Sequence, residues 1–386
     1  MDISKPASVL DVLTDNFKED FHAAMTFYAE KYPEDIKRAI LYILSAVIFT
    51  ITSALLRGIG RTDKYALYSF LSGAIKILLN VFFIAVLHWG VEGMLYASIF
   101  SQFGVALLCF VNLRVWRYID FHTLEKNKAK DMIRYSIPLI PNKLSWAIIN
   151  LSDRIIIMNR LGSNFSGLYA VANKFATLTD TLYGFFYQSW KESSARVVGE
   201  NSKNEFYNSI YTYLKDFMYP LVLLMAAFMP LIFSLLVNSS YHEAIIYVPF
   251  LLIATYFSNI SGFYGGIFTA YKDTKIMGMT TGASAIINLA VNLLMINRLG
   301  LYSAAISTLV ANIVVYIYRK IKVRKYVRLN ESRTKKWVAL LVTVLITFCF
   351  YTATMPAVIF SCILSLVYAV ASNLKLFKIA VKAIRR

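Results

Sequence analysis

The chain has few residues of the kinds that covalent cross-linking and catalysis need. Its 386 residues include only three cysteines and four histidines. Cys109, Cys349 and Cys362 lie within apolar segments and lack CxxC or metal-ligand spacing, so we expect buried small side chains. The histidines fall in polar segments, and the motifs GxSxG, HExxH and Walker A are absent. We therefore expect no enzyme, no metal site and no cofactor.

Charged residues are also scarce, at 16% of the chain, whereas hydrophobic residues make up 58%. Apolar runs of about 20 residues, long enough to cross about 30 Å of hydrocarbon, recur along the chain. We predict an all-α integral membrane protein with about eleven transmembrane helices. The predicted spans lie near 38–56, 66–88, 93–113, 137–159, 165–188, 214–237, 244–268, 276–296, 301–318, 337–354 and 357–373.

Acidic residues are outnumbered by basic ones, 22 to 40, which gives a net charge of +18. The basic residues gather in the short segments between spans, as the positive-inside rule requires, so the charge indicates membrane topology and no nucleic-acid partner. Segments 57–64, 114–134 and 319–336 and the tail after 373 all fall on one side of the membrane. We predict a cytoplasmic C-terminus, and an odd number of spans then places the N-terminus outside.

Two stretches, 61–93 and 271–302, read alike at an offset of 210 residues. Each contains a polar turn, an apolar helix, a glycine turn and the start of another helix. A duplicated unit of this kind indicates two related lobes, and membrane transporters with such repeats place their substrate site between the lobes. The aligned pairs are Asp63 with Asp273 and Gly90 with Gly300.

The repeat also bears on the domain organisation. In the second lobe, three spans precede the span at 244–268 that leads into the repeated unit. In the first lobe, no apolar segment precedes the equivalent span at 38–56. We infer a shortened member of a fourteen-span architecture, with the first three helices of one lobe missing. The alternative is an eleven-span protein in which residues 1–37 form an amphipathic surface helix. Those residues are polar and acidic-rich, which predicts no cleavable signal peptide.

The predicted divisions follow from these spans. They are a polar N-terminal segment (1–37), a partial first lobe of three helices (38–118), a second lobe of six helices (135–320), a basic cytoplasmic loop (321–336), and two extra helices with a basic tail (337–386).

Ionisable residues inside the spans are the candidate functional residues. Lys76 and Lys174 lie near the middle of their spans, Asp153 and Arg154 in the outer third of one span, and Asp180 in the inner third of the next. A charge at that depth costs at least a few kcal/mol unless it faces a cavity or a partner. The cavity interpretation is favoured for both lysines, whereas Arg154 has the alternative of snorkelling to the outer headgroups. Deep basic side chains suit a bulky anionic substrate such as a diphosphate.

Polar and aromatic side chains in the spans have less specific interpretations. Asn288 and Asn292 are four residues apart and share a helix face, which favours hydrogen bonds between helices over substrate contact. Tyr183 and Trp190 belong to an aromatic group that is typical of interface anchors, with sugar stacking as the alternative.

The order of motifs in the second lobe resembles the seventh and eighth helices of bacterial polysaccharide flippases. These flippases belong to the multidrug/oligosaccharidyl-lipid/polysaccharide exporter superfamily. The stretch 57–65 and the turn 90–93 are similar to that family's fourth to sixth helices, and the resemblance covers about residues 38 to 320. The residues that carry it are Tyr135-Ser136-Ile137-Pro138-Leu139-Ile140-Pro141-Asn142, Trp146, Ser152-Asp153-Arg154, Gly162, Gly167-Leu168-Tyr169 and Asn173-Lys174.

The resemblance implies a flippase in the bacterial cytoplasmic membrane. It would move undecaprenyl-diphosphate-linked oligosaccharide repeat units for capsule, O-antigen or exopolysaccharide synthesis, by alternating access of two lobes around a cationic cavity. By position, Arg154, Lys174 and Lys76 would contact the substrate, and Asp153 and Asp180 would orient them or couple transport to an ion. The implied partners are the lipid-linked oligosaccharide, membrane lipids, and a polysaccharide polymerase or glycosyltransferases.

Two alternatives remain. A cation-coupled multidrug extruder of the same superfamily would be expected to have acidic cavity residues, whereas the deep charges here are mainly basic. A truncated, non-transporting membrane partner of polysaccharide assembly is the other.

Overall fold

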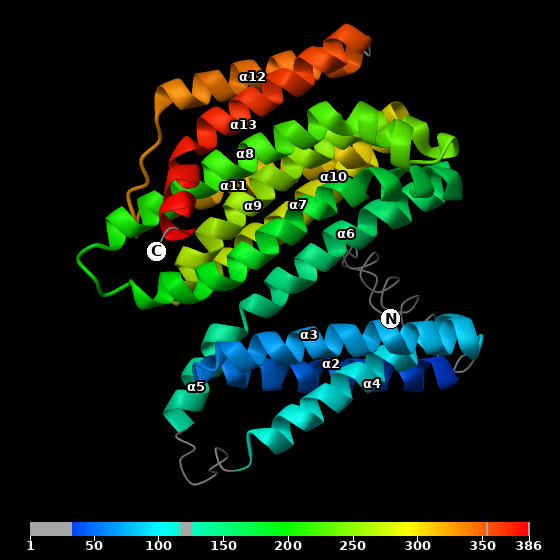
Figure 1. Cartoon of the computed structure of the whole chain (residues 1–386), viewed down its shortest axis with the longest axis vertical. Coiled ribbons are helices and arrows are strands. Elements are labelled where there is room, and N and C mark those ends of the chain that lie inside the picture. Colours follow the sequence, from blue (N-terminus) through cyan, green and yellow to red (C-terminus); the bar gives the residue numbers. More distant parts are fainter. Residues whose placement is uncertain (1–32, 115, 117–125, 353, 385–386) are drawn as a thin grey trace, which may run out of the picture. The chain divides into compact units, whose positions relative to one another are not determined.

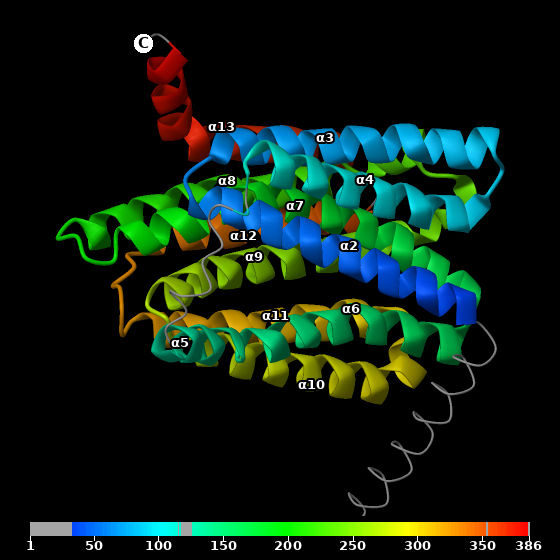
Figure 2. The ribbon, with the colours of Figure 1, turned by 90° about the horizontal axis from the view of Figure 1, so that it is seen from below.

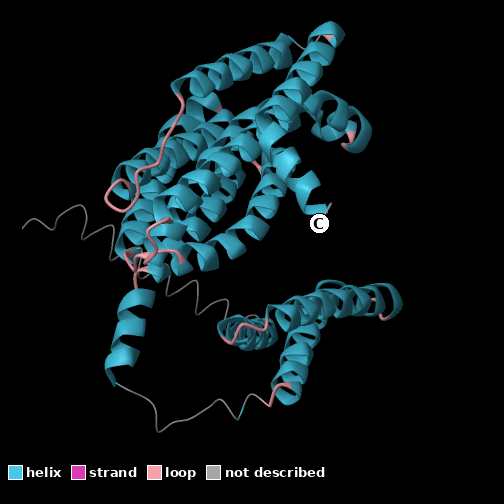
Figure 3. Ribbon diagram, turned by 60° about the vertical axis from the view of Figure 1, so that its left-hand side comes forward, coloured by secondary structure: helices cyan, strands magenta, loops and turns pink. Residues whose placement is uncertain are grey.

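Every element of the described chain is a helix (Figures 1 and 3). The computed structural model describes residues 33–384 except 115, 117–125 and 353, so most of the predicted segment 1–37 lies outside the described residues. The prediction of an all-α membrane protein is confirmed. The helices are α2 (Pro33–Gly58), α3 (Thr62–Val81), the π-helical η1 (Phe82–Val86), α4 (Gly90–Asn112), α5 (Lys126–Ser136), α6 (Leu139–Leu161), α7 (Ser163–Arg196), α8 (Lys203–Leu236), the 3-10 helix η4 (Ser239–Tyr247), α9 (Val248–Ala270), α10 (Thr274–Leu299), α11 (Tyr302–Val323), α12 (Arg333–Thr352) and α13 (Met355–Ile384).

Nine of the described helices are long and apolar enough to cross a membrane. The two predicted spans that fall outside this set are α6 and α7, with 23 and 34 residues. Their length suffices for about 30 Å of hydrocarbon at 1.5 Å per residue, so polarity and not length sets them apart. The same two helices carry four of the five predicted site residues, Asp153, Arg154, Lys174 and Asp180.

The chain divides into two compact units, Met1–Leu124 and Glu125–Arg386, called unit 1 and unit 2 below. In unit 1, helices α2, α3 and α4 enclose a small core of Leu56, Tyr68, Val105 and Cys109. Asn112 Nδ2 donates a hydrogen bond of 3.2 Å to the Tyr68 hydroxyl at one end of this core. Cys109 therefore packs as a small apolar side chain, as the sequence predicts.

Unit 2 is built around α9, which is buried along its length by α7, α8 and α11. Helices α6, α10 and α11 lie side by side against one another (Figure 2). Helices α12 and α13 pack against α8. Both α7 and α8 extend beyond the predicted spans, and the Tyr207 hydroxyl joins them there with a 2.7 Å hydrogen bond to the carbonyl oxygen of Ser194.

Trp190 and Tyr183 are not interface anchors, so that prediction is wrong for these two residues. Both are buried, and the indole Nε1 of Trp190 donates a hydrogen bond of 3.0 Å to the carbonyl oxygen of Phe263 on α9. A Cβ atom on Gly262 or Gly266 would collide with these rings. The glycines of α9 therefore let large aromatic side chains of α7 pack directly against its backbone.

The turns that begin the two repeated units have the same backbone conformation. Arg61 N donates to Leu56 O at 2.9 Å in one turn, and Asp273 N donates to Phe268 O at 2.8 Å in the other. Gly60 and Lys272, which precede them, both have positive φ. The structure therefore pairs Arg61 with Asp273, two residues away from the predicted alignment of Asp63 with Asp273.

The glycine turns at the other end of the units agree with the predicted alignment. Gly90 and Gly300 have φ values of 55° and 53°, a region that is costly for residues with a Cβ atom. The first unit is therefore two residues longer than the second between its two turns. The π-helical segment η1 lies within this longer copy, where its wider turns hold more residues per turn.

The loop 324–332 is shorter than the predicted basic loop 321–336. Its Glu331 side chain attaches it to α8 and α11. The Glu331 carboxylate accepts hydrogen bonds from Lys320 Nζ at 2.7 Å and from the Tyr211 hydroxyl at 2.5 Å. Lys215 and Lys336 also pair with it. Burial by itself raises the pKa of the Glu331 carboxyl, but the hydrogen bonds from the lysines and from Tyr211 outweigh it and hold this pKa well below its usual range.

This lowered pKa predicts how unit 2 responds to acid. A carboxyl whose pKa is lower in the folded state stabilises the fold above its unfolded pKa, and the contribution is lost as the pH falls through the folded value. Glu331→Gln should cost about 2–3 kcal/mol at pH 7 because it leaves the lysines without their counter-charge. The difference from wild type should shrink below about pH 4.5, the usual carboxyl value. Unfolding of the purified chain between pH 3 and 7 measures it.

A matched control is Glu205→Gln, at an exposed position on α8. This variant should leave stability unchanged across the same pH range. A Glu331→Gln protein as stable as wild type at pH 7 would contradict the account of the loop.

Candidate functional site

Asp153 is the most deeply buried of the predicted site residues, with 3% of its surface exposed. It lies on α6, and Arg154 beside it is exposed. Successive residues of an α-helix point about 100° apart, so the acid faces the interior of unit 2 while the base faces away from it.

Three neighbouring helices each donate a hydrogen bond to the Asp153 carboxylate. Asn292 Nδ2 on α10 is 2.8 Å from Oδ1. The Thr308 hydroxyl on α11 and the Tyr169 hydroxyl on α7 are 2.8 Å and 3.1 Å from Oδ2. The carboxylate thus lies where α6, α7, α10 and α11 meet, and these helices are held to a common point.

A second layer of polar side chains supports the first. The Ser303 hydroxyl donates to Asn292 Oδ1 at 2.9 Å. Asn288 Nδ2 donates to Ser307 Oγ at 3.3 Å and to Thr308 Oγ1 at 3.2 Å. The structure confirms that the Asn288 and Asn292 side chains bond between helices.

Asn288 retains one buried group without a hydrogen bond. Its Oδ1 atom has no partner within the described residues, and the residue is fully buried. A buried carbonyl oxygen of this kind costs free energy unless a donor or a cation reaches it. The Nδ2 atom of the same amide contacts Thr308, which itself contacts Asp153, so the network includes an unused acceptor.

The network contains a negative charge and no positive one. The donors Tyr169, Asn292 and Thr308 are neutral, and Asp153 has no ion pair within the described residues. A carboxylate in an apolar interior needs a proton or a cation to balance it. Carboxylate, amide and hydroxyl oxygens are hard ligands, suited to a small hard cation. The arrangement can therefore take up and release a proton or such a cation.

The remaining predicted site residues lie elsewhere. Arg154, Lys174 and Asp180 are exposed in unit 2, and Lys76 is partly buried in unit 1. Among the described side chains, none of the three cations forms an ion pair. Asp153 bonds to neutral donors, and no hydrogen bond or ion pair joins it to Arg154 within the described residues.

Tyr169, Ser303 and Thr308 were not among the predicted site residues. For two of them, Tyr169 and Thr308, the sequence holds a signal. Tyr169 belongs to the motif at 167–169, and Thr308 meets the helix face that Asn288 and Asn292 mark. The sequence pattern assigns these residues no partner, because the contacting helices are up to 155 residues apart along the chain.

Arg319 is a second buried charge, and it corrects the prediction that this residue belongs to a basic loop. It lies within α11 with 2% of its surface exposed. Its Nε donates to the Thr280 hydroxyl at 3.0 Å and its Nη2 to the Thr281 hydroxyl at 2.8 Å. Its Nη1 donates to the Ser261 carbonyl oxygen at 3.1 Å. The guanidinium therefore joins α9, α10 and α11.

The two asparagines of α10 give a matched test of the network. Asn292→Ala removes a donor from Asp153 and an acceptor from Ser303, and should cost about 2 kcal/mol. Asn288→Ala should cost about 1 kcal/mol or less, because its two hydrogen bonds are long and its Oδ1 is unused. Thermal unfolding in detergent measures both. A larger loss for Asn288→Ala would contradict the described network.

Comparison with known proteins identifies similar chains. Residues 21–190 match the family described as polysaccharide biosynthesis protein. An uncharacterized membrane protein of Methanocaldococcus jannaschii is 20% identical over 308 residues, which cover 74% of this chain and 71% of that protein.

Solved structures show the same fold at low identity. An outward-facing multidrug resistance MATE family transporter of the MOP superfamily aligns with a TM-score of 0.66 at 18% identity, over 79% of this chain and 74% of that one. A MOP superfamily transporter from Pyrococcus furiosus, for which reverse polarity of the binding pocket suggests a different function, aligns with a TM-score of 0.63 at 19% identity, over 75% and 69%. At this level of identity the solved structures show a shared fold, and the family match covers residues 21–190.

Proposed function

We propose that this protein is a flippase that moves oligosaccharide repeat units linked to undecaprenyl diphosphate across the cytoplasmic membrane. The match of residues 21–190 to polysaccharide biosynthesis proteins supports the substrate class. The all-helical fold, shared with transporters of the superfamily, supports translocation as the activity.

The observation that carries the proposal is that two basic residues in the predicted spans are exposed and lack ion pairs within the described residues. Arg154 and Lys174 are exposed on helices of unit 2 and have no ion pair within the described residues. A cation at membrane depth that faced lipid would be costly, so an aqueous cavity is the favourable surrounding. Guanidinium and ammonium groups there can bind the oxygens of a diphosphate, which a cationic drug does not offer.

A cation-coupled multidrug extruder is the second candidate, because a multidrug resistance MATE family transporter shares this fold. Asp180, exposed on α7, is the acidic residue that this candidate would use. The basic excess argues against it. The transporter from Pyrococcus furiosus, described with a binding pocket of reverse polarity, offers a precedent for a change of pocket charge within this fold.

We further propose that the Asp153 network couples transport to a proton or a small cation. The carboxylate is buried, lacks a counter-charge in the described structure, and is linked through Thr308 to Asn288, whose Oδ1 is unused. Asp153 and Arg154 are consecutive residues on α6. Neutralisation of the acid would therefore change the electrostatic potential at the neighbouring base, and so its affinity for an anion.

The role of the basic residues is tested by flipping in proteoliposomes. Arg154→Ala and Lys174→Ala should each lower the rate of transfer of a lipid-linked oligosaccharide at least tenfold, because each removes a positive charge that binds the substrate. Arg160→Ala is the matched control, since Arg160 is an exposed arginine in the last turn of the same helix. Its flipping rate should stay near that of wild type. Equal flipping rates in all three variants would contradict substrate binding by Arg154 and Lys174. Pumping of a cationic drug instead of the lipid-linked oligosaccharide would favour the extruder.

The coupling proposal predicts a different phenotype for Asp153→Asn. The amide cannot carry the negative charge that a proton or cation neutralises, so the flipping rate should no longer respond to proton or sodium gradients. Thr308→Ser is the control, because it retains the hydroxyl that contacts Asp153. Comparison of rates with and without each gradient measures the effect. A gradient response that persists in Asp153→Asn would exclude this site from coupling.

A further inference from the structure

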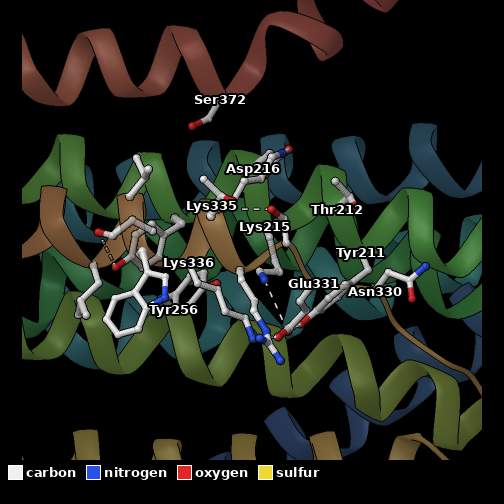
Figure 4. Close-up of a pocket in the computed structure, with 18 of the residues that line it drawn as sticks. Tyr211, Thr212, Lys215, Asp216, Tyr256, Asn330, Glu331, Lys335, Lys336 and Ser372 are labelled. Carbon is white, nitrogen blue, oxygen red and sulfur yellow. Dashed lines mark hydrogen bonds and ion pairs between the residues drawn. The ribbon is translucent and has the colours of Figure 1, made fainter.

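Unit 2 contains a cavity of about 1180 Å³ that is separate from the Asp153 network. It is lined by residues of α8, α9, α11, α12 and α13 and of the loop 324–332. Figure 4 shows Lys215 and Tyr211 of α8 directed toward Glu331 of the loop, with Ser372 of α13 on the opposite side. Neither the family match nor the proposed transport activity assigns a ligand to this space.

The charges that line the cavity do not balance. Glu331 alone neutralises Lys215, Lys320 and Lys336, and Lys215 is the most distant of the three, with its Nζ 3.6 Å from Oε1. Asp216 pairs with Lys335 at 2.6 Å. Arg333 lines the same cavity and has no ion pair within the described residues. Five cationic side chains therefore face two carboxylates, and the surplus attracts an anion.

The mouth of the cavity is next to an apolar surface. Trp337, Val338 and Leu340 line it and are 70%, 45% and 51% exposed. They lie four to seven residues after Arg333 on α12, a helix apolar enough to span a membrane. The cations thus lie at the end of a span, at the depth where phospholipid headgroups lie, and the exposed apolar side chains lie at the depth of the acyl chains.

We propose that this cavity binds the headgroup phosphate of an anionic phospholipid, held by Arg333 and Lys215, with its acyl chains along α12. Guanidinium and ammonium groups bind phosphate oxygens with charge-assisted hydrogen bonds. Basic pockets between helices on the cytoplasmic side are a known form of lipid recognition, and the distribution of basic residues predicts that the loop 324–332 is cytoplasmic. The bound lipid would connect α8 to α12.

Lipid binding to the purified full-length chain tests the proposal. Native mass spectrometry with added phosphatidylglycerol should show a bound lipid, and phosphatidylcholine, whose headgroup has no net charge, should bind at least tenfold more weakly. The double variant Lys215→Gln, Arg333→Gln should bind phosphatidylglycerol about tenfold more weakly than wild type. Lys215→Arg, Arg333→Lys retains both charges and should bind it like wild type.

The matched control is Lys322→Gln, Arg324→Gln, which removes two charges at the same end of α11 but outside the cavity lining. Its affinity for phosphatidylglycerol should be unchanged. Binding of inorganic phosphate, measured by isothermal titration calorimetry in the absence of lipid, distinguishes a free anion from a headgroup. Binding of phosphate as tight as that of the lipid would overturn the proposal, as would equal losses in the control and in the cavity variant.

Discussion

The structure of unit 2 depends on one constraint, which is that a charge removed from water must receive hydrogen bonds or a counter-charge. Three buried or partly buried charges meet it in different ways. Asp153 accepts from three neutral donors, Arg319 donates to hydroxyl and carbonyl oxygens, and Glu331 is surrounded by lysines. Each of these groups joins segments far apart in the chain. The polar contacts therefore specify which helices meet, which apolar side chains by themselves do only weakly in a membrane.

The same constraint separates structural charges from candidate functional ones. Arg319 has several hydrogen bonds and is closed off from solvent, so it serves the packing of α9, α10 and α11. Arg154 and Lys174 have neither burial nor an ion pair within the described residues. Asp153 is intermediate, because its hydrogen bonds are made but its charge is not balanced. This unbalanced charge is the basis of the proposed coupling to a proton or a small cation.

The sequence predicts the helices well and their partners poorly. Long apolar runs predict nine of the spans in the described chain, because hydrocarbon thickness sets a minimum length. The shared face of Asn288 and Asn292 predicts interhelical bonding, but only the fold brings Asp153 and Thr308 to them. Arg319 is misassigned to a loop because it opens a run of basic residues, whereas α11 continues through it to Val323 and the hydroxyls of α10 satisfy its donors. Trp190 shows a similar limit, since only the glycines of α9 reveal that an interface-like aromatic group can be buried.

The central claim is that the deep cations bind an anionic lipid diphosphate. Its most direct test is the equilibrium affinity of the purified chain in nanodiscs for undecaprenyl diphosphate and for undecaprenol, which has the same tail without the charge. The account predicts that the diphosphate binds at least tenfold more tightly, and that Arg154→Ala removes this preference. Equal affinity for the two lipids, or a preference unaffected by the loss of Arg154, would contradict it.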